Sequence, residues 1–395
     1  MAAYGIIIYN KGYMAQALYR KYRPKKLGDV LGQETNVEIL KSAAKAGRLG
    51  QAYIFYGGRG TGKTTTARLI AKLLNCEKRR TDPKFAALGE PCNECRECLA
   101  IDAQNSMDVI EIDAASNRGI DEIRNLKESI QVSPSTPGAH KVYIIDEAHM
   151  LTGAAFNALL KTLEEPPKHA AIIMATTEFE KLPPTITSRA QRFVFKKLPK
   201  TTIMEKLVAI AKEEKIAIDA AAIELIAAAA EGSFRDAESL LDQVSSLAGA
   251  SATGSAGGST KTNGISLADV ERVTGRTGLK KVHAFAEVIV KKDLPGALAY
   301  LAELNEEGHN LLQFAKDLIH YLRKVLSLKV NPSLKTLMER DLTNDEVADA
   351  MALGAAADVQ TFVKLIKALI RAYAEMRYSP FAAVPLEVAL VENLS

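Results

Sequence analysis

The segment GGRGTGKT at residues 57–64 decides how the first half of this chain folds, because it fits the pattern G-x-x-x-x-G-K-[ST] in full. An apolar run at residues 52–56 precedes it, and a helical pattern at residues 63–74 follows it. In this context the backbone N–H groups of the turn point at phosphates from a helix N-terminus, which a chance glycine-rich turn would not do. We therefore expect ATP to be held by Gly57, Gly58, Arg59, Gly60, Thr61, Gly62, Lys63, Thr64 and Thr65.

Three further apolar runs indicate a parallel sheet around this turn. They occupy residues 109–112, 141–145 and 170–175, and a helical pattern at residues 153–164 is ended by two prolines. Short strands that alternate with helices are typical of βαβ units. The first 200 residues are therefore predicted to form an α/β fold with helices flanking a parallel sheet.

Adjacent carboxylates follow the run at 141–145. Acidic pairs are common on solvated surfaces, but Asp146 and Glu147 come at the end of a buried strand in a chain with a complete phosphate loop. We expect Asp146 to bind Mg²⁺ together with the Thr64 hydroxyl, and Glu147 to activate water as a general base. The two motifs together predict ATP hydrolysis.

All four cysteines lie within 23 consecutive positions, as Cys76, Cys92, Cys95 and Cys98. Four thiolates at these spacings suit a tetrahedral zinc site with no open catalytic position. An iron–sulfur cluster, two disulfides and four unrelated thiols are the alternatives, and disulfides fit a reducing compartment poorly. We expect structural zinc.

Composition is that of a globular protein, with 47% apolar and 25% charged residues among 395. The net charge of +4 does not by itself indicate nucleic acid. Six basic residues precede the first acidic one, Asp29, and fit either phosphate binding or a solvated terminus. No apolar run approaches the roughly 20 residues that span a bilayer, and residues 1–11 make a poor signal peptide. We expect a cytoplasmic protein.

The second half of the chain has only helical patterns. A capping-box spacing at Thr202 and Glu205 predicts the start of the first helix, and a segment rich in Gly, Ser, Ala and Thr predicts a flexible linker. The predicted division is an N-terminal extension (1–16), a core (17–199) with the cysteine module (76–98), a helical lid (200–247), a linker (248–265) and a helical C-terminal domain (266–395).

At this point the motifs resemble one family, the gamma/tau subunit of the bacterial DNA polymerase III clamp loader, an AAA+ ATPase. Besides the cysteine module, the resemblance rests on residues 18–24 (LYRKYRP), 29–33 (DVLGQ), 113–119 (DAASNRG), 146–151 (DEAHML) and 156–167 (FNALLKTLEEPP). It implies an AAA+ core, an all-α lid and an all-α collar that joins subunits into a ring.

The resemblance also implies roles for residues around the nucleotide. Tyr19, Arg23 and Val30 would line its adenine and phosphate side. Thr177 looks like the sensor of the γ-phosphate, and Arg235 is similar to the sensor that the lid extends to the phosphates. Without the resemblance, Thr177 would be read as a strand-end hydroxyl and Arg235 as a surface charge.

Three more basic residues gain roles only from the resemblance. Ser188-Arg189-Ala190 matches the family's Ser-Arg-Cys motif except at its last position, so Arg189 would be an arginine finger for the ATP site of a neighbouring subunit. Arg118 and Lys161 would contact the DNA backbone without reading its sequence, although surface charges are an equal alternative.

The implied function is that of a motor that opens a sliding clamp and loads it on primed DNA during replication. Its implied partners are the delta and delta-prime subunits, further gamma/tau copies, the clamp and the DNA. A branch-migration helicase and a non-catalytic stator subunit are the alternatives. Since the sequence ends at Ser395, a short gamma-type form or a truncated piece is expected.

Overall fold

A parallel five-stranded sheet organises the first 200 residues, with the strand order β2-β3-β4-β1-β5. This computed structural model describes residues 16–117, 119–253, 264–339 and 342–394. The strands are β1 (Ala52–Gly57), β2 (Val109–Asp113), β3 (Lys141–Asp146), β4 (Ala170–Thr176) and β5 (Gln191–Phe195). Because the strands are parallel, their carboxyl ends meet at one edge, where sheets of this kind place their ligand sites.

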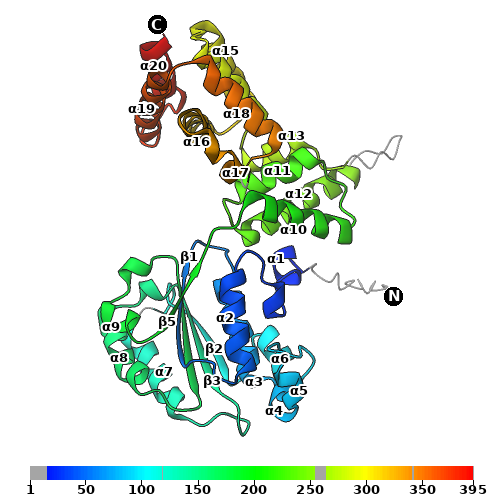
Figure 1. Ribbon diagram of the computed structural model, residues 1–395, viewed down its shortest axis with the longest axis vertical. Helices are drawn as coiled ribbons and strands as arrows, with labels where there is room; N and C mark the ends of the chain where they lie inside the picture. The colour runs from blue at the N-terminus through cyan, green and yellow to red at the C-terminus, as the bar shows by residue number, and fades with distance from the viewer. Residues whose placement is uncertain (1–15, 118, 254–263, 340–341, 395) are drawn as a thin grey trace, which may run out of the picture.

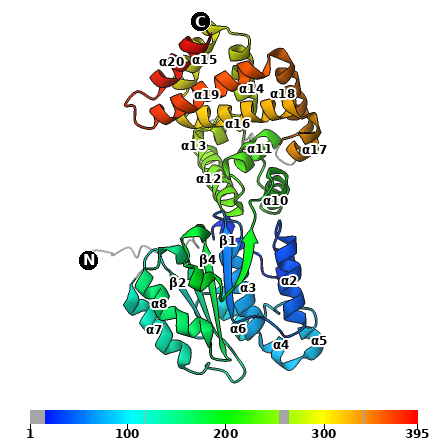
Figure 2. The ribbon, with the colours of Figure 1, turned by 60° about the vertical axis from the view of Figure 1, so that its left-hand side comes forward.

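Helices cover both faces of the sheet (Figures 1 and 2). One face carries α2 (Glu34–Lys45), α3 (Lys63–Asn75) and α6 (Arg96–Asp102), and the other carries α7 (Ile120–Gln131), α8 (Gly153–Glu164) and α9 (Pro184–Thr187). In β3, Val142 and Ile144 pack into the apolar cluster of α3, whereas Tyr143 and Ile145 pack into that of α8. Both faces are buried, which explains the uninterrupted apolar runs of the sequence. The predicted α/β core is confirmed.

The fifth strand is one that the sequence did not reveal. Among the strands that the structure describes, β5 pairs with β1 alone and lies at one side of the sheet. Its Phe193 and Phe195 are buried, but Gln191, Arg192 and Val194 are exposed. A short outer strand with one solvent-exposed face lacks the continuous apolar run by which the four other strands were recognised.

Short helical pieces complete the core body. They are η1 (Leu27–Asp29), α4 (Glu77–Thr81), α5 (Pro83–Ala86), η2 (Ala148–Met150) and η3 (Phe179–Lys181). A further short helix, α1 (Leu18–Lys21), precedes them in the chain but packs with the helices that follow the core. The excursion formed by α4, α5 and α6 lies against the end of α3 and contains all four cysteines (Figure 1).

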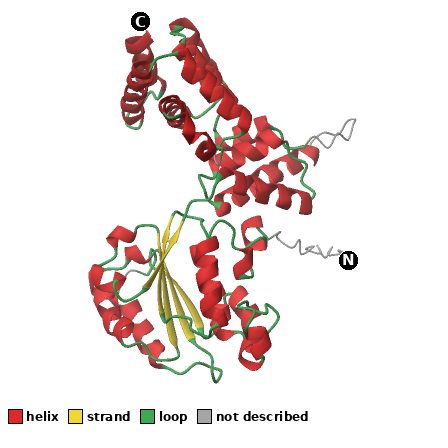
Figure 3. Cartoon of the chain, viewed as in Figure 1, coloured by secondary structure: helices red, strands yellow, loops and turns green. Residues whose placement is uncertain are grey.

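Four helices form the lid, which lies between the core and the C-terminal helices (Figures 1 and 3). They are α10 (Lys200–Glu213), α11 (Ala220–Ala229), α12 (Phe234–Thr253) and α13 (Leu267–Thr274). α10 begins directly after Pro199, so the capping box predicted at Thr202 is wrong. Proline is well suited to precede a helix because its fixed φ and missing N–H cost nothing there.

The predicted linker also differs from the structure. α12 continues to Thr253, because the alanines of this stretch favour helix. After residues 254–263, which lie outside the described part of the chain, Ile265 forms a bridge with Ile218, and α13 packs on α11 and α12. Residues 265–274 therefore pack against the lid helices in this structure.

The C-terminal domain is all helical, as predicted. Its elements are α14 (Leu279–Val290), α15 (Leu294–Glu306), α16 (Leu311–Val330), η4 (Pro332–Leu334), α17 (Lys335–Met338), α18 (Asn344–Ala356), α19 (Val359–Met376) and α20 (Ala383–Leu394). They share one apolar cluster, centred on Phe285, Phe314 and Phe362. No helix among the described residues is both long and apolar enough to cross a membrane.

Candidate nucleotide site and cysteine cluster

The phosphate loop joins the carboxyl end of β1 to the N-terminus of α3, as the sequence predicted. Gly62 precedes α3 in the left-handed region at φ 101°. Gly60 also has a positive φ, and a Cβ atom on it would lie 1.8 Å from the Ser233 hydroxyl of the lid. Only glycine permits this approach. The loop is therefore shaped for phosphates on one side and for contact with the lid on the other.

Lys63 is buried at the base of the loop. Its ammonium group donates hydrogen bonds to the carbonyl oxygens of Gly57 (3.0 Å) and Gly58 (2.7 Å). Burial lowers the pKa of Lys63, and the carboxylates of Glu147 and Asp146 oppose that shift. The lysine charge is thus fixed beside the loop and faces two acids.

Thr64 and Asp146 lie in direct contact, although 82 positions separate them in the sequence. The Thr64 hydroxyl donates to Oδ2 of Asp146 over 2.8 Å, and the N–H of Glu147 donates to Oδ1 over 3.0 Å. A hydroxyl and a carboxylate at this spacing are the hard oxygen ligands that suit Mg²⁺. The structure brings together the two residues predicted to share a metal ion.

Glu147 lies at the same edge but faces a different strand. Its backbone is left-handed, at φ 47°, and its Oε2 accepts a hydrogen bond from the hydroxyl of Thr177, directly after β4 (3.1 Å). The predicted general base and sensor are therefore neighbours.

His149 also lies beside Glu147, although the sequence suggested no role for it. Its Nδ1 lies 3.0 Å from the Thr176 hydroxyl and 3.5 Å from Oε2 of Glu147, and its Nε2 lies 3.2 Å from Oε1 of Glu178. Its place two positions after Glu147 was the available signal. The ring therefore lies near the same carboxylate oxygen that Thr177 contacts.

The lid and the N-terminal segment close over the loop. The Arg235 guanidinium lies 5.3 Å from the ring centre of Tyr19, and Cβ of Arg235 is 3.4 Å from the Cβ position at Gly60. Val30 is buried beside Gly62. Val30 and Arg235 thus lie beside the loop and Tyr19 lies beside Arg235, while their roles toward a nucleotide stay predictions. Among the described residues, no hydrogen bond or ion pair joins the Arg23 side chain to the loop.

Arg189 lies near the amino-terminal ends of β1 and β5, whereas the phosphate loop follows the carboxyl end of β1. It pairs with Glu164 (2.7 Å) and donates to the carbonyl of Thr185, just before β5 begins. Gln191 of β5 is in register with Tyr53 near the start of β1, so the length of β1, roughly 15 Å, separates Arg189 from its own phosphate loop. Ala190 packs on the apolar cluster of α8. The guanidinium, held by Glu164 and Thr185, is therefore far from the phosphate loop of its own chain.

The four cysteine sulfurs lie within 4.8 Å of one another, and all four are free thiols. Cys76 follows the last residue of α3, and its sulfur accepts the N–H of Cys92 (3.4 Å). The hydrogen bond from the Cys98 thiol lowers the pKa of Cys76 to about 4 and raises that of Cys98. This geometry excludes disulfides in the present structure and fits a tetrahedral metal ion.

A buried lysine fastens the cysteine module to the phosphate-loop helix. Lys72 of α3 is 1% exposed, and its ammonium lies 2.9 Å from Asn93 Oδ1 and 2.6 Å from Asp102 Oδ1. Removing either partner of a buried charge destabilises the folded protein strongly, because the charge is then left uncompensated. The module is thus joined to α3 both by Cys76 and by this ion pair.

The structure describes one of the two residues predicted to contact DNA. Lys161 is exposed on α8. Arg118 lies outside the described residues.

Comparison with known proteins identifies the family. Three family models match successive parts of the chain: "DNA polymerase III, delta subunit" at residues 32–199, "DNA polymerase III clamp loader subunit, ATPase lid domain" at 202–250, and "DNA polymerase III subunits gamma and tau domain III" at 265–394. Subunit tau of Bacillus subtilis is 38% identical over 377 residues, which is 95% of this chain and 63% of that protein. The chain belongs to the gamma/tau family of DNA polymerase III subunits.

Other gamma/tau proteins show the same relation. Subunit tau of Escherichia coli is 35% identical, over 96% of this chain and 55% of that protein. Subunit gamma/tau of Mycoplasma pneumoniae is 40% identical, over 80% of this chain and 43% of that protein. The chain thus spans less than two thirds of these relatives. The solved RuvB branch migration motor of Thermotoga maritima superposes with a TM-score of 0.45 and 19% identity, over 71% of this chain and 85% of that one. This similarity is too low to support a function.

Proposed function

We propose that this chain is an ATP-hydrolysing motor subunit of the bacterial clamp loader, part of the DNA polymerase III holoenzyme, which opens a sliding clamp and loads it on primed DNA. The observation that carries the proposal is the hydrogen bond between Thr64 and Asp146, with the Glu147–Thr177 contact beside it. It joins a phosphate loop, a metal-binding pair and a general base at the ends of β1, β3 and β4, which are neighbours in the sheet.

The chemistry assigns each of these residues one task. Mg²⁺, when bound with ATP, neutralises charge on the phosphate oxygens. Thr64 and Asp146 hold it, directly or through water, while Lys63 neutralises the outer phosphates. Glu147 accepts the proton of the attacking water, and Thr177 orients that carboxylate. Arg235 reaches the phosphates from the lid.

Arg189 completes the site of a neighbouring subunit. Its position at the opposite edge of the sheet supports this role, because it cannot serve its own loop. In a ring, that edge of one copy faces the phosphate loop of the next. Catalysis by each loop then depends on assembly with further gamma/tau copies and with delta-type subunits.

The cysteine module holds a structural zinc ion. Four thiolates leave no open position for a substrate, and their mutual distances suit one tetrahedral ion. The family setting is bacterial replication in the cytoplasm, where thiols stay reduced. Lys161 and Arg118 are proposed to contact the phosphates of primed DNA, with an affinity that falls as salt rises.

Two alternatives are less well supported. A non-catalytic stator has no need for Lys63, Thr64, Asp146 and Glu147 in one site. A branch-migration helicase of the same fold does not account for the cysteine module or for the match to the gamma and tau domain III at the C-terminus.

The test is reconstitution of the loader with a circular clamp and a primed template, measuring clamp loading against ATP turnover. Turnover should be low for this chain alone and rise when partner subunits, clamp and primed DNA are added. The Lys63→Ala variant, assembled in the same way, should lose both activities. A turnover rate that ignores the clamp and the primed DNA would overturn the clamp-loading proposal.

A further inference from the structure

The N-terminal segment of the chain is divided between two bodies of the molecule. Leu18, in α1, is 6% exposed and belongs to the apolar cluster of the lid, and its N–H donates to Oδ2 of Asp242 on α12 (3.4 Å). Figure 1 shows α1 next to the lid helices. Although it precedes the sheet in sequence, α1 is packed as a part of the lid.

Glu214, directly after α10, holds α1 in this position. One oxygen of its carboxylate, Oε1, accepts the Tyr22 hydroxyl over 2.5 Å and lies 2.6 Å from the Lys21 ammonium. Burial and this carboxylate raise the pKa of Tyr22, which therefore stays a hydrogen-bond donor. Two consecutive side chains of the N-terminal segment thus meet one acid of the lid.

The next part of the segment belongs to the core. Leu27 is fully buried in the core cluster. The Gln33 amide donates to the carbonyl of Lys196 and the Asn36 amide to that of Val194, both over 2.8 Å. The chain therefore passes between the two bodies at residues 23–26, and it does so again between β5 and α10 at residues 196–199.

Tyr19 precedes the connection at residues 23–26 and so belongs to the part of the segment that packs on the lid, one helical turn from Tyr22. Its ring centre lies 5.3 Å from the guanidinium carbon of Arg235, a lid residue whose Cβ is next to Gly60 of the phosphate loop. The loop holds phosphates through backbone N–H groups, whereas an aromatic ring joined to the lid beside it offers a surface for a base. The ring is placed there by contacts with the lid.

We infer that Glu214 is a positioning residue that fixes Tyr19 to the lid, so that the lid carries the contact with the nucleotide base while the core loop carries the phosphates. This inference rests on the proposed function, because it requires that ATP binds. It predicts that loss of the Glu214 contact weakens binding of ATP but leaves binding of a bare triphosphate unchanged.

The experiment compares two probes, ATP and inorganic tripolyphosphate, each with Mg²⁺, by titration calorimetry on the full chain. The Glu214→Ala and Tyr22→Phe variants should each bind ATP about fivefold to tenfold more weakly, as should Tyr19→Ala. Affinity for tripolyphosphate should stay within about twofold of the parent. Glu205, an exposed carboxylate on α10, provides the matched control. The Glu205→Ala variant should change neither the affinity for ATP nor the affinity for tripolyphosphate.

A double variant, Glu214→Ala with Tyr22→Phe, should bind ATP no more weakly than either single variant, because both changes break the same contact. Equal losses for ATP and tripolyphosphate would assign Glu214 a merely structural role and overturn the inference, as would unchanged ATP binding in both single variants. Tyr22→Phe removes a single hydroxyl and keeps the test valid if Glu214→Ala does not fold. Failure of the parent chain to bind ATP would instead overturn the proposed function.

Discussion

At the scale of single residues, two adjacent carboxylates acquire different tasks because the backbone turns between them. Asp146 ends β3 and faces Thr64, whereas Glu147, in a left-handed conformation, faces Thr177. A non-glycine residue in this region is uncommon and is often found at functional sites. The turn separates the proposed metal ligand from the proposed base.

The residue-scale prediction concerns the Glu147→Gln variant. The amide keeps the shape of the side chain but cannot accept a proton, so ATP turnover in the reconstituted loader should fall about 100-fold or more. Dissociation constants for ATP should stay within about threefold, since Lys63 and the loop are intact. Glu180→Gln, exposed on η3, is the control. Turnover close to that of the parent would remove Glu147 as the base.

At the scale of elements, the cysteine module shows how a surface excursion is stabilised without a large core. α4 and α5 are only five and four residues long, and none of their side chains is fully buried. Helices of this length are not stable alone. The cysteine cluster and the Lys72 ion pair supply the missing constraint and attach the excursion to α3.

The element-scale prediction is that the Cys95→Ser variant loses the metal and melts at a lower temperature, by at least about 5 °C, because a structural metal ion contributes directly to folding. Elemental analysis of freshly prepared, reduced protein measures the zinc, and calorimetry measures the melting. The Glu94→Gln variant, which changes an exposed neighbour of Cys95, should keep the zinc content and the melting temperature of the parent protein. Absence of zinc from the parent protein would refute the assignment of the metal.

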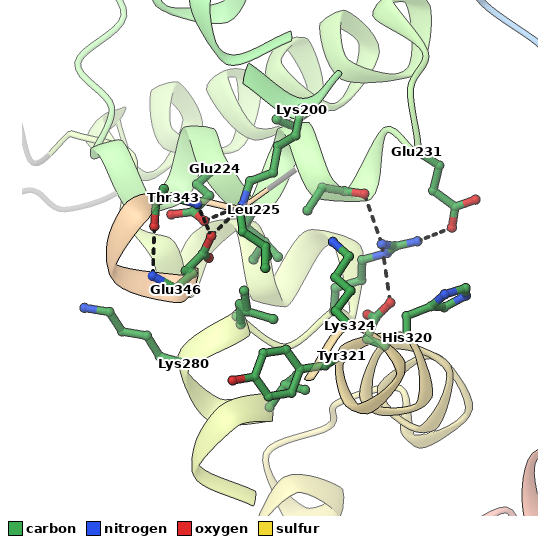
Figure 4. A pocket seen from close by; sticks show the side chains of 18 of the residues that line it. Lys200, Glu224, Leu225, Glu231, Lys280, His320, Tyr321, Lys324, Thr343 and Glu346 are labelled. Atoms are coloured by element: carbon green, nitrogen blue, oxygen red, sulfur yellow. Dashed lines mark hydrogen bonds and ion pairs between the residues drawn. The ribbon is translucent and has the colours of Figure 1, made fainter. Parts of the chain in front are cut away.

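At the scale of the whole molecule, a charged joint connects the lid to the C-terminal domain. A cavity of about 1060 Å³ lies between them (Figure 4). The ammonium group of Lys200 on α10 bridges Glu224 of α11 (2.5 Å) and Glu346 of α18 (3.4 Å). Across the cavity, Arg276 pairs with Glu231 (2.7 Å). The joint is thus held by ion pairs that respond to pH and salt.

Glu346 makes this joint sensitive to pH near neutrality. Burial, together with the hydrogen bond to Glu224, raises the pKa of Glu346 from 4.5 to about 7. The folded protein therefore retains a proton that the unfolded chain releases. The stability from this proton is present below about pH 4.5 and is lost as pH rises through about 7.

We expect the melting temperature to fall as pH rises from 6 to 8, with a loss on the order of 1 kcal/mol from this group. The Glu346→Gln variant should show a smaller fall. Glutamine preserves the capping box with Thr343, so the helix itself is not perturbed. Thermal melts of both proteins across this range test the prediction, which parallel pH profiles would contradict.

Arg189 provides a second prediction at this scale. In the assembled loader, Arg189→Ala should leave nucleotide binding unchanged and reduce ATP turnover about 100-fold or more, since an arginine finger acts on transition-state charge. The control is Arg192→Ala, an exposed arginine on β5. Full turnover in the Arg189→Ala assembly would exclude it as the finger.

Local sequence patterns were enough to predict the phosphate loop, the acidic pair, the cysteine cluster and four of the five described strands. Each of these depends on residues close together in the chain, where a required turn, helix start or ligand spacing restricts the local pattern. The same reasoning missed β5, whose single buried face leaves a weak pattern, and gave Thr177 and Arg235 roles only through resemblance.

Which of these motifs meet depends on how distant parts of the chain pack together. The contacts of Thr64 with Asp146, of Glu214 with Tyr22 and of Lys200 with Glu346 join positions 82, 192 and 146 residues apart. Strand order and lid packing create them, and neither leaves a periodic signal in the chain. For the same reason the sequence could not show that Arg189 lies at the opposite end of the strands from its own phosphate loop.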